Sequence, residues 1–213
     1  MLGLAIHTTS PQLGLAIAAI DSQEPIARHQ VWDLGRDVSS HLHVKLIEFI
    51  APYTWQDLSF IAVAKGPGGF TGTRIGVVAA RTLAQQLEIP LFGVSALAAI
   101  AAQSLAQTTF DCSGDVAVSM PAKREAVYGA IYRPDEAGDL TPLVAEAVVP
   151  QGEWANIVAT WKQPLREVTM EAGVGTADSV SGVMALAKLR WERGDRPEWA
   201  SVLPFYGQHP VHR

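Results

Sequence analysis

A glycine-rich segment at residues 65–76 constrains this chain more than any other feature. Five glycines lie between Gly66 and Gly76, after an apolar run at 60–64 and before a helical pattern at 75–87. Glycine lets another backbone or a ligand approach closely. A strand that re-enters as a helix through such a turn also exposes N–H groups that suit phosphate or carboxylate. The segment therefore predicts either an anion-binding turn or a tight packing turn.

The strict phosphate-binding motifs do not fit this segment. A Walker A loop needs glycines five positions apart, followed by Lys and Ser or Thr, and no pair of glycines here has that spacing. A dinucleotide fingerprint starting at Gly66 and Gly68 would need a third glycine where Thr71 stands. Taken alone, the segment favours a compact strand-to-helix turn.

Composition narrows the class of protein. The chain has 213 residues, 48% of them hydrophobic, which suits one large domain or two small ones. No uninterrupted apolar run approaches the roughly 20 residues of a membrane span, and the N-terminus has no basic region typical of a signal peptide. The single cysteine, Cys112, excludes an internal disulfide. We therefore expect a cytoplasmic protein without a membrane partner.

The charge of the chain bears on its partners. A net charge of −5 argues against a stand-alone nucleic-acid binder, so we expect contact with RNA only through an assembly. Charged residues make up 17%, below the roughly 25% of ordinary domains. A surface with so few charges indicates apolar area that a partner covers.

Apolar periodicity and turn residues predict two similar series of elements. In the first half we expect strands at 2–8, 13–20, 26–34, 58–64 and 90–94, and helices at 39–51, 73–88 and 96–105. The second half predicts strands at 116–120, 126–132, 143–149 and 167–170, with helices at 153–161 and 180–191. We place N-caps at Ser39-Ser40 and at Ser95.

The repeated order βββαβα predicts the fold class. It is the plan of the actin-like ATPase (ribonuclease H-like) fold, an α/β fold with two lobes, here with a reduced second lobe. We place the N-terminal lobe at 1–108 and the smaller C-terminal lobe at 109–213, with the boundary in a polar stretch.

The glycine-rich segment resembles the signature of a known family. Its residues 66–76, GPGGFTGTRIG, are similar to the GPGSFTGLRIG signature of the TsaB (YeaZ) family, and 89–97, IPLFGVSAL, are similar to the family's IPLVGVSSL. The strand expected at 58–64 resembles the one that precedes the signature. The signature residues are Gly66, Pro67, Gly68, Gly69, Phe70, Thr71, Gly72, Arg74 and Gly76.

The resemblance implies a non-catalytic subunit. TsaB supports TsaD, which with the ATPase TsaE transfers a threonylcarbamoyl group to an adenosine of tRNA. ATP and a metal would enter through these partner subunits, so no cofactor is expected on this chain alone. The family pairs through its first two helices, here 39–51 and 73–88. The interface residues implied by this analogy are His41, Leu42, Lys45, Arg74, Ile75, Val78, Ala79 and Thr82.

Three departures from the family pattern bear on catalysis. His7 stands where the family commonly has an aspartate, and an imidazole does not replace a carboxylate on Mg²⁺. Pro121 and Ala126 replace an acidic pair at the start of the second lobe. We therefore assign no catalytic residue. The alternative, a nucleotide-binding phosphotransferase or a metallopeptidase-like enzyme of the same superfamily, stays open.

Two further expectations concern metals and assembly. His41 and His43 are two positions apart on a helix, so they point to different faces and do not share a metal ion. Without its partner, the apolar helical face is expected to form a homodimer. Replacing Ala79 or Ala80 by glutamate would test that face.

Overall fold

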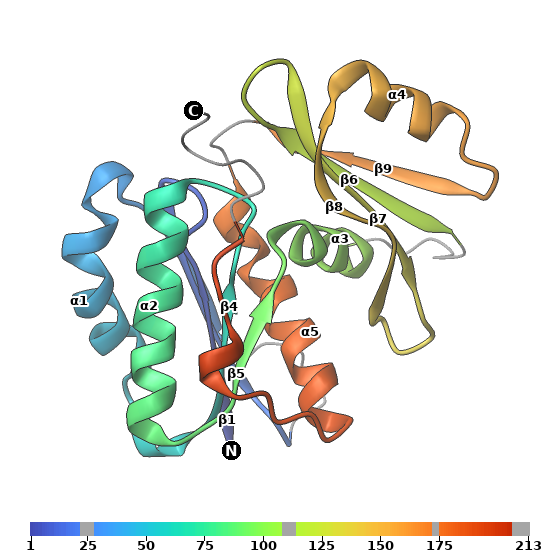
Figure 1. Cartoon of the computed structure of the whole chain (residues 1–213). Coiled ribbons are helices and arrows are strands. Elements are labelled where there is room, and N and C mark those ends of the chain that lie inside the picture. The colour runs from blue at the N-terminus through green and yellow to red at the C-terminus, as the bar shows by residue number, and fades with distance from the viewer. Residues whose placement is uncertain (22–27, 108–113, 172–174, 206–213) are drawn as a thin grey trace.

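The protein has two β-sheets with helices between and outside them (Figure 1). The computed structural model describes residues 1–21, 28–107, 114–171 and 175–205. The first sheet contains β1 (Leu2–His7), β2 (Gln12–Ala19), β3 (Arg28–Asp33), β4 (Leu58–Ala64) and β5 (Leu91–Val94). The second contains β6 (Asp115–Pro121), β7 (Ala126–Pro134), β8 (Leu140–Pro150) and β9 (Leu165–Thr169).

The two sheets repeat one topology. The first has the order β3-β2-β1-β4-β5, with β1 antiparallel to β2 and parallel to β4. The second has the order β8-β7-β6-β9, with β6 antiparallel to β7 and parallel to β9. The second sheet has no counterpart of β5 within the described residues. The predicted duplication with a reduced second lobe is therefore present.

Five α-helices of the described chain cover the sheets in layers. They are α1 (Val38–Ile50), α2 (Phe70–Leu87), α3 (Ala96–Ala106), α4 (Gln151–Ala159) and α5 (Val180–Glu192). Figure 1 shows α1 and α2 side by side on the outer face of the first sheet, and α3 and α5 on its other face. Helix α3 also contacts the second sheet, whose far side carries α4.

Side-chain size differs between the two faces of the first sheet. Successive residues of a strand point to opposite faces. In β1 and β2 the large residues, such as Leu4 and Leu15, pack toward α1 and α2. The alternate positions carry alanines such as Ala5 and Ala16, which face α5. Small residues on that face allow α5 to lie close to the strands.

Helix α5 joins the two halves of the sequence. It follows the second sheet in the chain, yet it packs against β1, β2, β4 and β5 of the first. Gly182 lies so close to α3 that an added Cβ would be 2.0 Å from the carbonyl oxygen of Ala99. The predicted lobe boundary between 108 and 109 lies outside the described residues and stays a prediction.

The predicted elements are all present, and most of their ends differ from the predicted ones by one to three residues. Helix α1 begins at Val38 with Asp37 as its N-cap, so Ser39 and Ser40 lie inside the first turn and the predicted cap was wrong. Helix α2 begins at Phe70, earlier than the predicted 73. Residues 26 and 27 of the strand predicted at 26–34 lie outside the described residues. The cap at Ser95 is confirmed, because its Oγ accepts from the N–H groups of residues 97 and 98.

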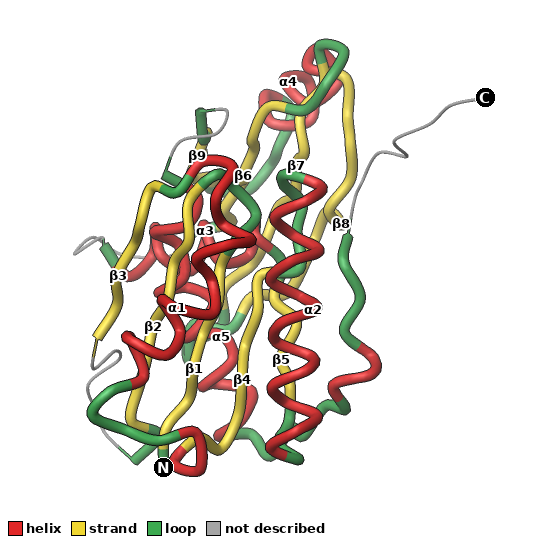
Figure 2. The backbone as a smooth tube through the Cα atoms, turned by 90° about the vertical axis from the view of Figure 1, so that its left-hand side faces the viewer, coloured by secondary structure: helices red, strands yellow, loops and turns green. Residues whose placement is uncertain are grey.

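The last described residues run along the edge of the first sheet. The N–H of Leu91 in β5 donates to the carbonyl of Pro197 at 3.3 Å, and the N–H of Phe205 donates to the carbonyl of Lys65 at 2.7 Å. The segment can be followed in Figure 2, where it rises past the sheet toward the C-terminus. We call residues 195–205 the C-terminal strap.

Candidate functional site

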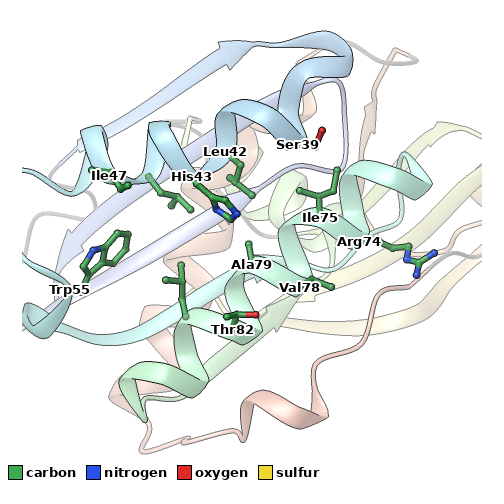
Figure 3. Close-up of a pocket in the computed structure, with 12 residues that line it drawn as sticks. Ser39, Leu42, His43, Ile47, Trp55, Arg74, Ile75, Val78, Ala79 and Thr82 are labelled. Carbon is green, nitrogen blue, oxygen red and sulfur yellow. The ribbon is translucent and has the colours of Figure 1, made fainter.

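An open groove separates α1 from α2 on the outer face of the first sheet. It has a volume of about 690 Å³, and apolar side chains from both helices face each other across it (Figure 3). Arg74 lies at one end and Trp55, from the turn before β4, at the other. The lining residues are Ser39, Leu42, His43, Leu46, Ile47, Trp55, Arg74, Ile75, Val78, Ala79, Thr82 and Leu83.

Large apolar side chains of this face are exposed to solvent. Ile47 of α1 is 63% exposed and Val78 of α2 is 59% exposed. Val44, on the same helix as Ile47, is 49% exposed. A cluster of exposed apolar side chains on neighbouring helices is typical of a surface that binds another protein. We call the residues that line this pocket the α1–α2 groove.

Six of the eight predicted interface residues line the groove, namely Leu42, Arg74, Ile75, Val78, Ala79 and Thr82. The other two do not line it. His41 is exposed, and its Nδ1 lies 3.1 Å from the carbonyl of Asp37. Lys45 pairs with Glu48, Nζ to Oε2, at 2.8 Å.

Sequence reasoning missed the other half of the groove. Leu46 and Ile47 both line the groove and were not among the predicted interface residues; Leu46 is buried, whereas Ile47 is 63% exposed. Helical periodicity could not assign Trp55 to the groove, because this residue lies in a short turn outside both helices. Ala80 is completely buried, whereas Ala79 lines the groove. Of the two proposed glutamate substitutions, only the one at 79 therefore places its carboxylate on this face.

The glycine-rich segment is packed against the turn that follows β1. An added Cβ would lie 2.2 Å from the carbonyl oxygen of Thr8 at Gly72, and 2.1 Å from Oγ1 of Thr8 at Gly76. At Gly68 it would lie 2.3 Å from the carbonyl oxygen of Thr9. These distances are too short for any side chain, so the glycines are needed for the close approach of the protein itself.

Hydrogen bonds hold the same contact. The N–H of Gly69 donates to the carbonyl of Thr9 at 2.6 Å, and Oγ1 of Thr8 donates to the carbonyl of Gly72 at 2.8 Å. The segment therefore uses its glycines for internal packing, which is one of the two interpretations that its sequence allowed. The contact holds the first turn of α2 in place. It therefore also positions the α2 side chains that line the groove.

A cleft lies between the two lobes beside this segment. It has a volume of about 810 Å³ and is lined by the glycine-rich segment, the turn at Thr9-Ser10, and residues of the second lobe. Its charged lining residues, among those described, are Arg36, Lys123 and Glu171. Pro121, which replaces the family's aspartate, is also in the wall.

His7 lies completely buried at the end of β1, next to the turn at Thr8-Thr9. The hydroxyl of Ser179 donates to the carbonyl of Thr176 at 2.7 Å, so it accepts from Nε2 of His7 at 3.2 Å. Nδ1 of His7 is buried without a hydrogen-bond partner in the described structure. Burial lowers the pKa of His7 to about 3, so the imidazole is neutral at physiological pH.

Within the described residues, no three or more His, Cys, Asp or Glu side chains gather as they would around a metal ion. Cys112 is outside those residues. No helix of the described part has both the length and the apolar run that a membrane crossing requires.

The duplicated sheets define an α/β protein of the actin-like (ribonuclease H-like) class, as predicted. The solved structure of YeaZ from Pseudomonas aeruginosa superposes with a TM-score of 0.76 at 24% identity, covering 96% of this chain and 99% of that one. The profile of the family described as "TsaD: tRNA N6-adenosine threonylcarbamoyltransferase" matches residues 46–182.

Curated relatives carry a more specific name. The "tRNA threonylcarbamoyladenosine biosynthesis protein TsaB" of Bacillus subtilis (strain 168) is 39% identical over 167 residues, which are 76% of this chain and 68% of that protein. The TsaB protein of Escherichia coli (strain K12) is 32% identical over 135 residues, 57% of this chain and 56% of that protein. The chain belongs to the TsaB (YeaZ) family, and the predicted resemblance is confirmed.

Proposed function

We propose that this protein is a subunit of the machinery that makes threonylcarbamoyladenosine in tRNA, and that it acts by binding a TsaD-like catalytic subunit. Its relatives are named as biosynthesis proteins of this modified nucleoside. Binding would hold the catalytic subunit in an active conformation, and tRNA would be reached through the complex.

The α1–α2 groove is the observation that carries the proposal. It presents exposed apolar side chains from two helices, and its polar groups, such as Arg74 and Thr82, accompany an apolar centre. Protein interfaces have an apolar centre and a polar rim. A helix or loop of the partner that packs between α1 and α2 would cover Ile47 and Val78 together.

The buried His7 at the end of β1, next to the turn that lines the interlobe cleft, supports a subunit without catalysis of its own. His7 replaces a carboxylate, is held by Ser179, and is kept neutral by burial. A neutral imidazole closed off from solvent neither holds Mg²⁺ nor exchanges protons readily with a substrate. ATP and the metal of the overall reaction are therefore proposed to bind partner subunits, including a TsaE-like ATPase.

The same groove is also proposed to form a homodimer when the catalytic subunit is absent. A second copy of α1 and α2 would cover the exposed side chains in a symmetric pair. The two assemblies would then compete for one surface, so adding the partner should convert dimers into heterocomplexes.

Co-elution with the TsaD-like subunit of the same organism tests the proposal. The chain alone and the mixture are compared by gel filtration with light scattering, which measures mass directly. We expect a heterocomplex in the mixture and loss of the homodimer. A mixture that elutes as two separate components over a range of concentrations would contradict the proposal.

An assay of the purified chain with ATP and Mg²⁺ addresses the enzyme alternative. We expect no turnover above the background of a sample without protein. Sustained ATP hydrolysis or phosphoryl transfer by the chain alone would favour the phosphotransferase interpretation. Peptide hydrolysis that a chelator abolishes would favour the metallopeptidase interpretation.

A further inference from the structure

A basic pocket lies beside β5, at the edge of the first sheet. It has a volume of about 580 Å³ and is formed by the residue after β4, the last turn of α5, and the C-terminal strap. It shares no lining residue with the α1–α2 groove or with the interlobe cleft. A partner seated on α1 and α2 would therefore leave it accessible.

Three cations and one carboxylate line this pocket. Arg196 stacks on the ring of Trp191 at 3.4 Å and donates to backbone carbonyls, while Asp195 supplies the carboxylate. Lys65 and Arg190, both half-buried, have side chains without an ion pair or hydrogen bond to the part of the chain that the structure describes. The pocket is thus positively charged in a protein whose net charge is −5.

Lys65 and Arg190 are half-buried and form no ion pair with Asp195 or with any other described residue, which calls for a physical explanation. Partial burial removes some of their hydration, and placing two like charges in the wall of one pocket is also unfavourable. The last turn of a helix favours a cation such as Arg190, but its partial negative charge is small. An anion between the two side chains would offset both costs, and such concave positive sites concentrate anions.

The strap and β5 add a backbone donor and an apolar wall. The N–H of Leu91 points to the strap, and since alternate residues of a strand share an edge, the N–H of Gly93 points the same way. A Cβ at 93 would lie 2.9 Å from Val202, so glycine lets the strap lie close to β5. Leu203 is 61% exposed at the rim of the pocket.

We propose that this pocket binds a phosphate ester, with Lys65 and Arg190 on the phosphate and the strap against the organic part. The guanidinium fork of arginine and the point charge of lysine together suit phosphate oxygens. The volume exceeds that of a phosphate ion alone, and the apolar wall suits the attached group. The phosphate comes from an RNA backbone or from a free nucleotide. The proposal goes beyond the pairing with a catalytic subunit and does not depend on it.

Titration of the isotope-labelled full chain by NMR tests the pocket. The probes are adenosine 5′-monophosphate and a single-stranded RNA of about ten nucleotides. We expect saturable shifts of the amides of Gly93 and Val202 with at least one probe. Shifts confined to the interlobe cleft, or no saturable shift with either probe, would overturn the proposal.

Variants that remove one positive charge test whether Lys65 and Arg190 bind the phosphate. Lys65→Gln and Arg190→Gln should each weaken binding at least tenfold, whereas Lys162→Gln, an exposed lysine outside the pocket, should leave it unchanged. The amide spectrum of each variant shows whether the fold is retained. If the two pocket variants and the control bind the probe with equal affinity, the proposal that this pocket binds phosphate is wrong.

The two probes separate the sources of phosphate. RNA that binds at least tenfold more tightly than the nucleotide, with an affinity that falls as salt rises, assigns the pocket to an RNA backbone. A nucleotide that binds as tightly as the RNA assigns it to a free phosphate ester. Failure of both probes leaves the co-elution result with the catalytic subunit untouched, so the two proposals fail separately.

Discussion

The glycine-rich segment and the α1–α2 groove share Arg74 and Ile75, but one is tightly packed and the other is open to solvent. The segment is filled by the protein itself, since the backbone of Thr8 and Thr9 occupies the room that side chains would take. The groove is left open, with Ile47 and Val78 exposed. The most conspicuous sequence feature therefore serves packing, and the surface available to a partner is built from ordinary apolar residues that the segment positions.

The largest expected effect comes from filling the segment. Gly72→Ala would push a Cβ to 2.2 Å from the carbonyl oxygen of Thr8, so the turn must move. We expect the free energy of unfolding to fall by about 3 kcal/mol, at the upper end for overpacking. Urea unfolding followed by circular dichroism measures it.

Gly152→Ala is the matched control for that variant. Gly152 lies in α4, where an added Cβ would meet nothing within 4 Å. Alanine there should stabilise the helix by about 0.5–1 kcal/mol. Similar stability changes in both variants would show that the close approach at Gly72 has no special role.

The next largest effect should come from charging the groove. Val78→Glu places a carboxylate where a partner would bury it, so affinity for the TsaD-like subunit should fall about 100-fold, or roughly 2.7 kcal/mol. Because Val78 is 59% exposed, stability should change by less than about 0.5 kcal/mol. Calorimetric titration and urea unfolding measure the two quantities.

Ala155→Glu, on the exposed surface of α4, is the control for the added charge. It should leave affinity and homodimer formation unchanged. A loss of binding at 155 with none at 78 would move the interface to the second lobe. Equal affinities for both variants and the wild type would remove the groove from the interface.

Stability should depend on pH through His7. Its pKa is about 3 in the folded protein, whereas the unfolded imidazole titrates at its ordinary value of 6.5. Below pH 6.5 the unfolded state binds a proton that the folded state does not, so stability falls as pH falls. Between pH 6.5 and 5 the loss from this group is about 2 kcal/mol.

His7→Gln should remove this part of the pH dependence, since an amide does not titrate. His41→Gln, at an exposed position of α1, should leave the slope as in the wild type. Unfolding curves at pH 5, 6, 7 and 8 give the comparison. If the stability of the His7 variant changes with pH as much as that of the wild type, the buried imidazole is not the cause of the pH dependence.

The smallest effect should come from trimming one exposed side chain of the groove. Ile47→Ala removes apolar area that is 63% exposed in the free protein. We expect stability to change by less than about 0.5 kcal/mol, while affinity for the partner falls by about 1 kcal/mol if the side chain is buried in the complex. A stability loss larger than the binding loss would place Ile47 in the core.

The fold could be predicted because its elements depend on local periodicity. The alternation of large apolar residues with small ones in β1 and β2 predicts strands without any knowledge of the tertiary structure. The start of α2 was missed because Gly72 suggests a loop, whereas in the structure its carbonyl accepts a hydrogen bond from Thr8, far away in the sequence. Helix ends depend on such distant neighbours more than on propensity.

The sites were less predictable, because they depend on which side chains stay uncovered and on contacts between residues that are distant in the sequence. Ile47 has the spacing of a buried residue, and nothing local tells that no element covers it. His7 and Ser179 are 172 positions apart. The basic pocket brings together residues 65, 190 and 202, which no spacing in the sequence connects. The family resemblance supplied half of the groove, because it carries information about a partner that the chain alone lacks.

The position of α5 has a consequence for how the protein is made. The inner face of the first sheet, with its row of alanines, is completed by a helix at residues 180–192. During synthesis the amino-terminal half therefore emerges from the ribosome while the part of this face that α5 covers is still exposed. This core is completed only after residues 180–192 have been translated, so the nascent chain exposes apolar surface until then.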